Sequence, residues 1–401
     1  MNYLSLKKTL CKNIAFIFFF IMLAVMIQSC EDNPNDLGFN FIPNIDTTIT
    51  RYLDSQTDTM NITSNNYKQF VNTFGSQNLL VGLYQGYTSK SLLKFISVPT
   101  DLDSATISSA VLTLRYSDYF FKEETGVTSF SIFKVNTNFG YSTVTYDSVT
   151  PSSIGNISQG SYSGSPIDTQ TISVTLNNQL AKDWLEYSAD SSYAEKNYGV
   201  ILQPNAGSTN IKGFYSFNNA IEFVPYVTVI FTKLGVTDTL VMNTTDYVSL
   251  SDAPSSIIPA DRFVLQNGIA FRNIMNFDLT KLPSNVIINN ATLILYLDKP
   301  NSFISPNTDK RLIAGMVLDS VTKKDSLFTE IFPLDSVTYS ISSPEFNAVF
   351  QRWNLGQLPN LGITLKNFFE LQNLDNFVIY SSTTPDVTKR PRLKITYTPR
   401  N

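Results

Sequence analysis

The chain repeats its own pattern, and this repeat limits the fold more than any other feature of the sequence. Ile107–Leu114 (ISSAVLTL) returns as Ile288–Leu295 (INNATLIL), and Asn197–Leu202 (NYGVIL) returns as Asn360–Leu365 (NLGITL). The segments follow one another in the same order in both copies. A repeat of this length is a whole folding unit that has been copied, so the 401 residues are expected to form two similar domains.

The ends of the two copies indicate where one stops and the next begins. Thr57–Thr59 matches Thr237–Thr239 near the start of each copy, and Pro225–Val229 matches Pro391–Ile395 near the end. The boundary is therefore expected between residues 233 and 236.

Apolar and polar residues alternate within both copies, as they do in half-buried β-strands. Ala110–Tyr116, Thr171–Leu176 and Val227–Phe231 show this alternation, and Gly, Asn, Asp and Pro separate such runs. Many short strands with little helix are typical of a sandwich or a barrel. The expected fold class is all-β.

Each copy contains one tryptophan, in a stretch with helical spacing. Leu176, Leu180 and Trp184 lie four residues apart, so a helix carries all three on one face. The matching stripe in the second copy consists of Phe346, Val349, Phe350 and Trp353. A tryptophan that stacks on a ligand is the alternative, but helical spacing favours a short helix that caps each sandwich with the indole as its anchor.

The N-terminus resembles a bacterial lipoprotein signal. Basic residues precede the apolar run Ile14–Ile27, which is short for a membrane span and suited to a signal-peptide core. Gln28-Ser29-Cys30 follows, and an apolar residue, two further residues and a cysteine resemble a lipobox, in which the Cys30 thiol takes the lipid. The alternative is an uncleaved anchor. If Cys11 leaves with the signal peptide and Cys30 is acylated, no disulfide framework remains.

The residues that follow Cys30 indicate where the protein is located. Glu31 and Asp32 resemble the export signal of Bacteroidota surface lipoproteins, which implies a lipid anchor in the outer membrane and a body that faces the cell exterior. The chain is therefore divided into residues 1–29 as signal peptide, 30–50 as lipidated N-terminus and tether, 51–233 as β-sandwich domain 1 and 234–401 as β-sandwich domain 2.

The order of segments resembles the DNRLRE family of secreted β-sandwich domains, some of which are carbohydrate-binding modules. Leu92–Phe95 is followed by Ile-x-x-Ala-x-Leu-x-Leu, a helix that ends in Trp, Asn-x-Gly with an apolar strand, and a closing strand after Pro. Cys30–Asp32, Leu79–Gly82 and the Tyr-Thr ending also resemble a Bacteroidota lipoprotein family of unknown function. Both resemblances imply two tandem jelly-roll-like β-sandwich domains, and neither supplies a catalytic motif.

The composition excludes several functions. The chain has no histidine, which excludes Ser-His-Asp catalysis and His-ligated metals. Its net charge of -4 offers no basic footprint for nucleic acid. Acid pairs such as Asp101/Asp103 and Glu123/Glu124 are expected to be solvated loop residues. No cofactor is expected, although a structural calcium near Asp101–Asp103 is an alternative.

Aromatic residues supply the candidate contact site. The candidates for contact with a ligand or a partner are Tyr84, Tyr87, Tyr116, Tyr119 and Phe120. Rings with polar neighbours suit sugars and protein surfaces alike, and the third interpretation is core packing.

Asp followed by Ser or Thr recurs along the chain and resembles the O-glycosylation sequon of exported Bacteroidota proteins. The candidate acceptors are Thr47, Thr59, Ser104, Ser148, Thr239, Ser320, Ser326 and Ser336. The same pair also forms ordinary turns, in which the side chain binds nearby backbone N–H groups.

These features predict a non-catalytic surface lipoprotein that binds, either as an accessory subunit of an outer-membrane protein complex or as an adhesin. Capture of an extracellular polysaccharide is the first alternative. A polysaccharide-degrading enzyme is the second, and it would need acids that converge in one groove.

Overall fold

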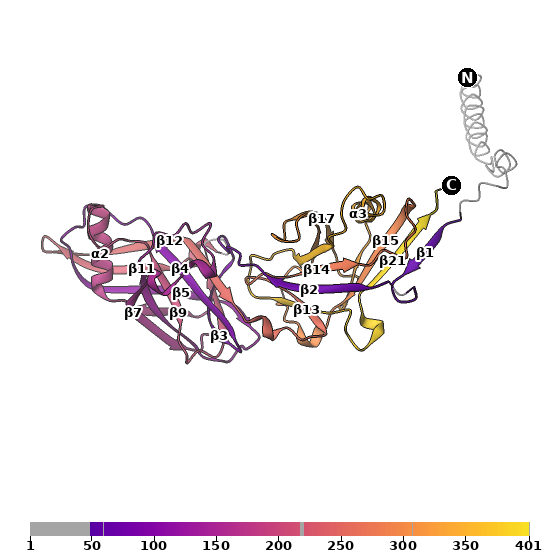
Figure 1. Ribbon diagram of the computed structural model, residues 1–401. Coiled ribbons are helices and arrows are strands. Elements are labelled where there is room, and N and C mark those ends of the chain that lie inside the picture. The colour runs from indigo at the N-terminus through magenta and orange to yellow at the C-terminus, as the bar shows by residue number, and fades with distance from the viewer. Residues whose placement is uncertain (1–48, 59, 217–219, 307, 401) are drawn as a thin grey trace, which may run out of the picture. The chain divides into compact units, whose positions relative to one another are not determined.

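The computed structural model describes residues 49–400 apart from 59, 217–219 and 307 (Figure 1). Cys30, Glu31, Asp32, Thr47 and Thr59 lie outside the described residues. Residues 50–401 form one compact unit.

The fold is all-β, as the sequence predicts, and consists of two jelly-roll-like sandwiches with one α-helix each. The first sandwich contains β3 (Asn78–Tyr84), β4 (Tyr87–Phe95), β5 (Thr106–Phe121), β6 (Thr128–Val135), β7 (Ile154–Gly164), β8 (Thr171–Thr175), β9 (Val200–Pro204), β10 (Ile211–Tyr215), β11 (Tyr226–Lys233) and β12 (Val236–Asp252). One sheet has the order β12-β11-β5-β8, and the facing sheet is built on β12-β4-β9-β6-β7 with β3 and β10. The long strands β5 and β12 run through both sheets.

The second sandwich has the same topology. It contains β1 (Arg51–Asp54), β2 (Ile62–Lys68), β13 (Arg262–Gln266), β14 (Phe271–Phe277), β15 (Ile287–Tyr296), β16 (Leu312–Val317), β17 (Asp325–Ile331), β18 (Thr338–Ile341), β19 (Ile363–Asn367), β20 (Asn376–Tyr380) and β21 (Arg392–Thr398). One sheet has the order β1-β21-β15-β18, and the other is β17-β16-β19-β14-β13-β20, with β2 also paired to β14.

The strand pairing does not follow the domain boundaries expected from the sequence. β1 pairs with β21 and β2 pairs with β14, so the segment 51–68 completes the second sandwich (Figure 1). β12 pairs with β11 and β4, so the segment 236–252 completes the first. The two copies of the repeat have exchanged their first strands. The first sandwich is therefore continuous in sequence, and the second is interrupted by it.

A correction of the repeat alignment follows from this pairing. Thr57 and Asp58 lie in the turn after β1, whereas Thr237 and Asp238 lie inside β12. A period of two identifies a strand but not which of two similar sheets receives it.

The two predicted helices are present and each anchors a core, but Leu176, expected on the face of the first helix, lies before that helix begins. α2 (Asn178–Ala189) is capped by Asn177, and α3 (Pro344–Asn354) is capped by Ser343. Trp184 is fully buried in the core of the first sandwich, where its ring lies 5.5 Å from that of Phe95. Trp353 occupies the same place in the second core. This burial favours packing over ligand stacking.

A third apolar cluster joins the two sandwiches. It combines Leu80, Tyr119 and Phe121 of the first sandwich with residues such as Val264 and Leu374 of the second. Apolar surface removed from water at such a junction stabilises the contact by roughly 25 cal/mol per Å². This junction positions the site described next.

Candidate functional site

Three of the five aromatic residues predicted as contacts are buried. Tyr116 lies in the core of the first sandwich, and Tyr87 and Tyr119 lie in the cluster at the junction. Tyr84 and Phe120 are half-buried and keep an accessible edge. For Tyr116, Tyr87 and Tyr119 this burial favours the packing interpretation: the first sandwich's own core covers Tyr116, and the junction with the second sandwich covers the other two.

Tyr119 ties the two sandwiches together. Its hydroxyl donates to Asp375 Oδ1 at 3.1 Å and accepts from the backbone N–H of Leu374 at 2.9 Å. The same Asp375 accepts from the backbone N–H and the hydroxyl of Ser305 and from the hydroxyl of Thr308. The buried carboxylate of Asp375 is held in place by these donors. Desolvation raises the pKa of the Tyr119 hydroxyl.

An open groove of about 930 Å³ lies beside Tyr119. It is named the junction groove here because both sandwiches line it. The first sandwich contributes Gln77, Asn78, Asp118, Phe120 and Tyr215, and the second contributes Asn267, Asp309, Phe369, Gln372 and Asn373. Of the fifteen lining residues, five have amide side chains and four have aromatic rings.

The amides on the floor of the junction groove are only partly satisfied. Asn78 Nδ2 donates to Asn373 Oδ1 at 2.7 Å, while Asn78 Oδ1 is buried without a partner among the described residues. Asn267 accepts from Asn367 Nδ2, also at 2.7 Å. The Nδ2 groups of Asn267 and Asn373 donate to no described residue. The floor therefore offers free hydrogen-bond donors, as a site for a polar ligand does.

The charge of the junction groove is negative. Asp118 is exposed, accepts no hydrogen bond and makes no ion pair among the described residues, and its φ of 66° places it in a left-handed conformation. Asp309 is bound by Arg311 at 2.7 Å, and this hydrogen bond lowers the pKa of its carboxyl group. No Lys or Arg is among the described residues that line the groove.

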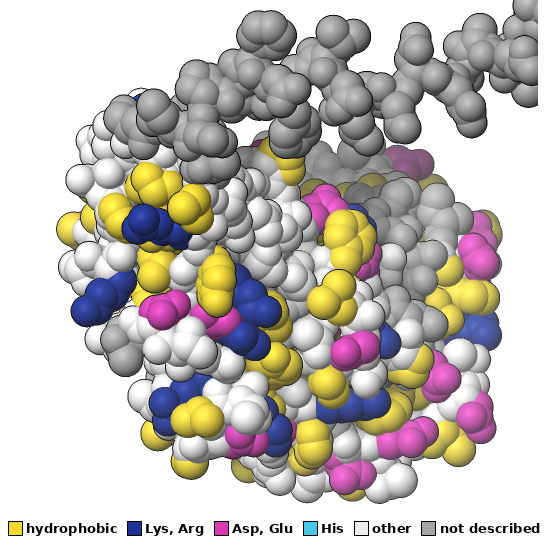
Figure 2. Space-filling model, turned by 90° about the vertical axis from the view of Figure 1, so that its right-hand side faces the viewer, with side chains coloured by type: hydrophobic (Ala, Val, Ile, Leu, Met, Phe, Trp, Pro, Cys, Tyr) yellow, Lys and Arg dark blue, Asp and Glu magenta, His cyan; other side chains and the backbone are white. Residues whose placement is uncertain are grey.

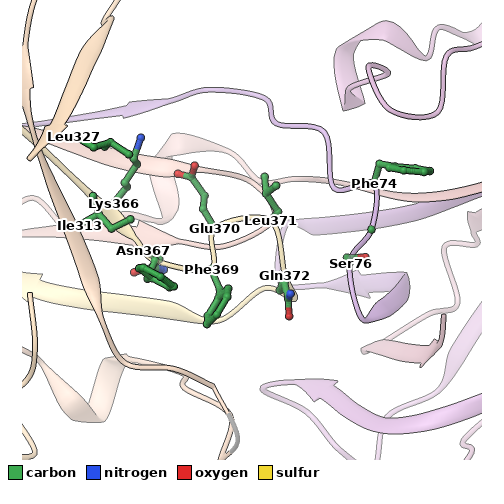
Figure 3. A pocket seen from close by; sticks show the side chains of 12 residues that line it. Phe74, Ser76, Ile313, Leu327, Lys366, Asn367, Phe369, Glu370, Leu371 and Gln372 are labelled. Atoms are coloured by element: carbon green, nitrogen blue, oxygen red, sulfur yellow. The ribbon is translucent and has the colours of Figure 1, made fainter. Parts of the chain in front are cut away.

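A second hollow, of about 380 Å³, lies at the segment that follows β19 and shares Phe369 and Gln372 with the junction groove (Figure 3). Phe74, Leu327, Phe369 and Leu371 line it and are each 40% to 53% exposed. Its charged lining residues are already paired, since Glu370 binds Arg272 and Lys366 lies 3.5 Å from Asp325. This hollow is apolar in character, in contrast to the junction groove.

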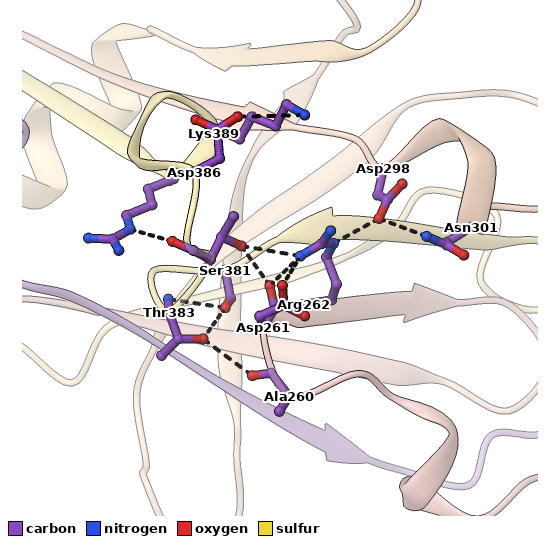
Figure 4. A network of polar contacts seen from close by, with 11 residues as sticks. Ala260, Asp261, Arg262, Asp298, Asn301, Ser381, Thr383, Asp386 and Lys389 are labelled. Atoms are coloured by element: carbon purple, nitrogen blue, oxygen red, sulfur yellow. Dashed lines mark hydrogen bonds and ion pairs between the residues drawn. The ribbon is translucent and has the colours of Figure 1, made fainter.

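A cluster of charged residues around Arg262 is structural (Figure 4). Arg262 binds Asp261 and Asp298 and stacks on Tyr380 with its guanidinium carbon 3.9 Å from the ring centroid. The hydrogen bonds lower the pKa of Asp298 against the opposing effect of burial. Every charge in this cluster has a partner, so it holds the loop after β20 in place and offers no free group.

The remaining predicted sites lie on the surface. Ser104, Ser148, Thr239, Ser320, Ser326 and Ser336 are all exposed. The Asp101–Asp103 turn already holds a cation, because Lys233 Nζ lies 2.6 Å from the Asp101 carbonyl oxygen and 2.9 Å from Asp103 Oδ1. In the described part of the chain, no three acidic side chains gather where they could hold a metal ion.

Other surface features are unremarkable in chemistry. On the face shown in Figure 2, apolar side chains are interspersed with side chains of both charges. Within residues 49–400 as described, no helix is long and apolar enough to span a membrane.

Sequence reasoning missed the amides of the junction groove. The signal was present in Leu371–Asn376 (LQNLDN), an amide-rich run between two strands. Amide-rich turns are common, so this run alone did not separate a binding site from an ordinary loop.

Comparisons with known proteins add little. No family model matches the chain, and no curated protein does. Among solved structures, the C-terminal domain of the Streptococcus pyogenes antigen I/II-family protein AspA aligns with 84% of this chain and 91% of that chain, at 7% identity and a TM-score of 0.18. A likeness of this size carries no argument about function.

Proposed function

We propose that this chain is a non-catalytic lipoprotein, anchored through Cys30 on the outer face of an outer membrane, that binds a partner as an accessory subunit of an outer-membrane complex or as an adhesin. The main support for a binding role is the junction groove. It is open, about 930 Å³ in volume, and lined by both sandwiches. Volumes of this order suit a ligand or a segment of a partner.

The chemistry of the junction groove supports binding rather than turnover. A glycosidase needs one carboxyl group that is protonated at working pH and a second that is ionised. Asp309 has a lowered pKa because Arg311 binds it, which makes it a poor proton donor. Asp118 is exposed and makes no ion pair among the described residues, although the buried Lys212 interacts with its charge through space.

The lipid anchor and the surface display are supported by the sequence around Cys30. A metabolic labelling experiment with a radioactive or alkyne fatty acid tests the anchor. We expect label on the chain and none on Cys30→Ser. Protease treatment of whole cells tests the display, and we expect loss of the chain from intact cells. A chain that resists protease until the outer membrane is opened would contradict display.

The binding role is tested by purification of the lipidated chain from its own membrane in mild detergent, followed by mass spectrometry. We expect a stoichiometric membrane protein to accompany it. A chain that emerges alone would count against an accessory subunit.

A further inference from the structure

We propose that the junction groove holds an extended, basic peptide segment of a protein partner, with Asp118 as the group that pairs with a Lys or Arg side chain of that segment. This inference rests on the proposed binding role and names the kind of partner. It follows from four features of the groove.

The first feature is how Asp118 is presented. Asp118 lies in the half of β5 that pairs with β10, and the register of that pair shifts between Lys212 and Phe214. Such irregularities re-aim side chains and are common next to functional sites. The left-handed φ of 66° at Asp118 is a strained conformation for a residue with a side chain. The exposed carboxylate that results has no ion pair among the described residues.

The second feature is the aromatic lining. Phe120 is half-buried, and Phe369 is 41% exposed on the other wall. A cation is attracted to the face of an aromatic ring, and more strongly when water is excluded. The methylene groups of a Lys or Arg side chain pack well on apolar surface. A side chain that pairs with Asp118 can therefore also contact the rings of Phe120 and Phe369.

The third feature is the set of free amide groups. The Nδ2 groups of Asn267 and Asn373 donate to no described residue, whereas the Oδ1 of Asn78 is buried and has no partner among the described residues. The carbonyl groups of a peptide backbone can accept hydrogen bonds from such free Nδ2 groups. The groove floor is thus suited to the main chain of a peptide in extended conformation.

The fourth feature is charge. No Lys or Arg is among the described residues that line the junction groove, and the charge of Asp309 is offset by Arg311. Acidic ligands are therefore disfavoured. The chain as a whole has a net charge of -4, which favours encounter with a basic partner.

The experiment places a photo-crosslinking amino acid at position 369 of the full, lipidated chain in its own membrane. Crosslinked peptides are then identified by mass spectrometry. We expect a segment of one protein with Lys or Arg near the crosslink. The matched control places the same amino acid at position 234, where Leu234 is 95% exposed on a distant hairpin, and it should not capture that segment.

A second variant makes the test quantitative. Asp118→Asn in the position-369 chain should lower the crosslink yield about tenfold, a loss within the range for a charged hydrogen bond. Asp238→Asn, which removes an exposed acid from β12, should leave the yield unchanged.

Two results would overturn the inference. One is a partner that still accompanies the chain while position 369 captures no protein segment, as a glycan in the groove would produce. The other is a captured segment without basic residues, or one whose yield ignores Asp118→Asn. Loss of every partner from the unmodified chain would instead refute the proposed binding role.

Discussion

The two sandwiches share a topology, but different kinds of segment complete their sheets. In the first sandwich a single strand, β12, of 17 residues pairs with both sheets. In the second, the short strands β1 and β2 do the same work, with a turn between them. The first sandwich is closed by a segment adjacent in sequence. The second depends on a segment that is separated from the rest of it by the whole first sandwich.

The two sandwiches also differ in how they accommodate buried cations. In the second, Arg272 binds Glu370, and both side chains are about nine-tenths buried. In the first, Lys212 is fully buried but donates to the carbonyl oxygen of Pro166 and lies 4.6 Å from the ring centroid of Tyr116. Burial lowers the pKa of Lys212. Arg272 is therefore balanced by a carboxylate, whereas Lys212 is held by a carbonyl group and a ring.

The largest expected effect concerns the exchanged strands. A fragment of residues 69–252 contains every strand of the first sandwich and should fold, whereas residues 51–233 lack β12 and should not. Removal of residues 1–68 from the full chain should unfold the second sandwich and spare the first, because an unpaired sheet edge and an open core remain. Circular dichroism and limited proteolysis measure these outcomes.

A chain that lacks only residues 1–50 is the control, since it keeps β1 and β2 and should stay folded. Independent folding of residues 51–233 would contradict the exchange.

The sequence predicted the class of fold because the relevant signals are local. Alternation identified the strands, and apolar residues three or four positions apart identified α2 and α3. The exchange was not predictable, because Thr57 and Asp58 match Thr237 and Asp238 in letters while only the second pair lies in a strand. Pairing depends on which sheet edge is free in three dimensions, and a single sequence carries no record of that.

The site was harder to predict for a related reason. The spacing of Tyr116, Tyr119 and Phe120 on β5 indicates that the rings alternate between faces, but not that a second sandwich covers one face. Tyr119 contacts residues more than 250 positions away, so its burial depends on contacts that no local pattern encodes. The junction groove likewise forms only where the two sandwiches meet, so no local pattern in the sequence predicts it.

The second prediction uses the tryptophans, one in each sandwich. Trp184→Ala and Trp353→Ala should each lower the free energy of unfolding of their own sandwich by about 3 to 5 kcal/mol, because a large cavity opens in a packed core. Since the chain has two tryptophans, the fluorescence of the remaining indole follows the other sandwich during denaturation.

Trp184→Phe and Trp353→Phe serve as the matched reporters. Both indole N–H groups are buried without an acceptor among the described residues, so Phe removes an unsatisfied donor and retains most of the volume. If either Ala variant destabilised both sandwiches equally, the junction would couple them into one folding unit. The two sandwiches would then not differ in stability.

The third prediction contrasts the buried cations. Arg272→Met leaves Glu370 buried without its partner and should cost about 3 to 5 kcal/mol. Lys212→Met strands no carboxylate and should change the free energy of unfolding by about 1 kcal/mol or less. Chemical denaturation measures both. Equal losses in the two variants would mean that the charge of Lys212 contributes as much as the buried ion pair of Arg272, although Glu124, Asp118 and Glu123 interact with Lys212 only through space.

The smallest effect should appear in acid, at β1. Arg392 donates to both carboxylate oxygens of Asp54, and this hydrogen bond lowers the pKa of Asp54 in the folded chain. A lowered folded pKa means that the stabilisation is complete above the ordinary aspartate value of about 3.9 and is lost as the pH falls through the folded value. Because Arg392 is partly exposed, the loss should be about 1 kcal/mol.

The first sandwich supplies the internal control for this acid effect. At the matching pair of strands, Thr228 faces Val241, and neither side chain titrates. Hydrogen exchange at pH 3 should therefore speed up in β1 relative to pH 7, after correction for the intrinsic rate, and β12 should not change. Asp54→Asn should abolish the difference. An equal loss of protection in β12 would show that acid acts on the whole unit, and that the separate closing strand of the second sandwich is not its weak point.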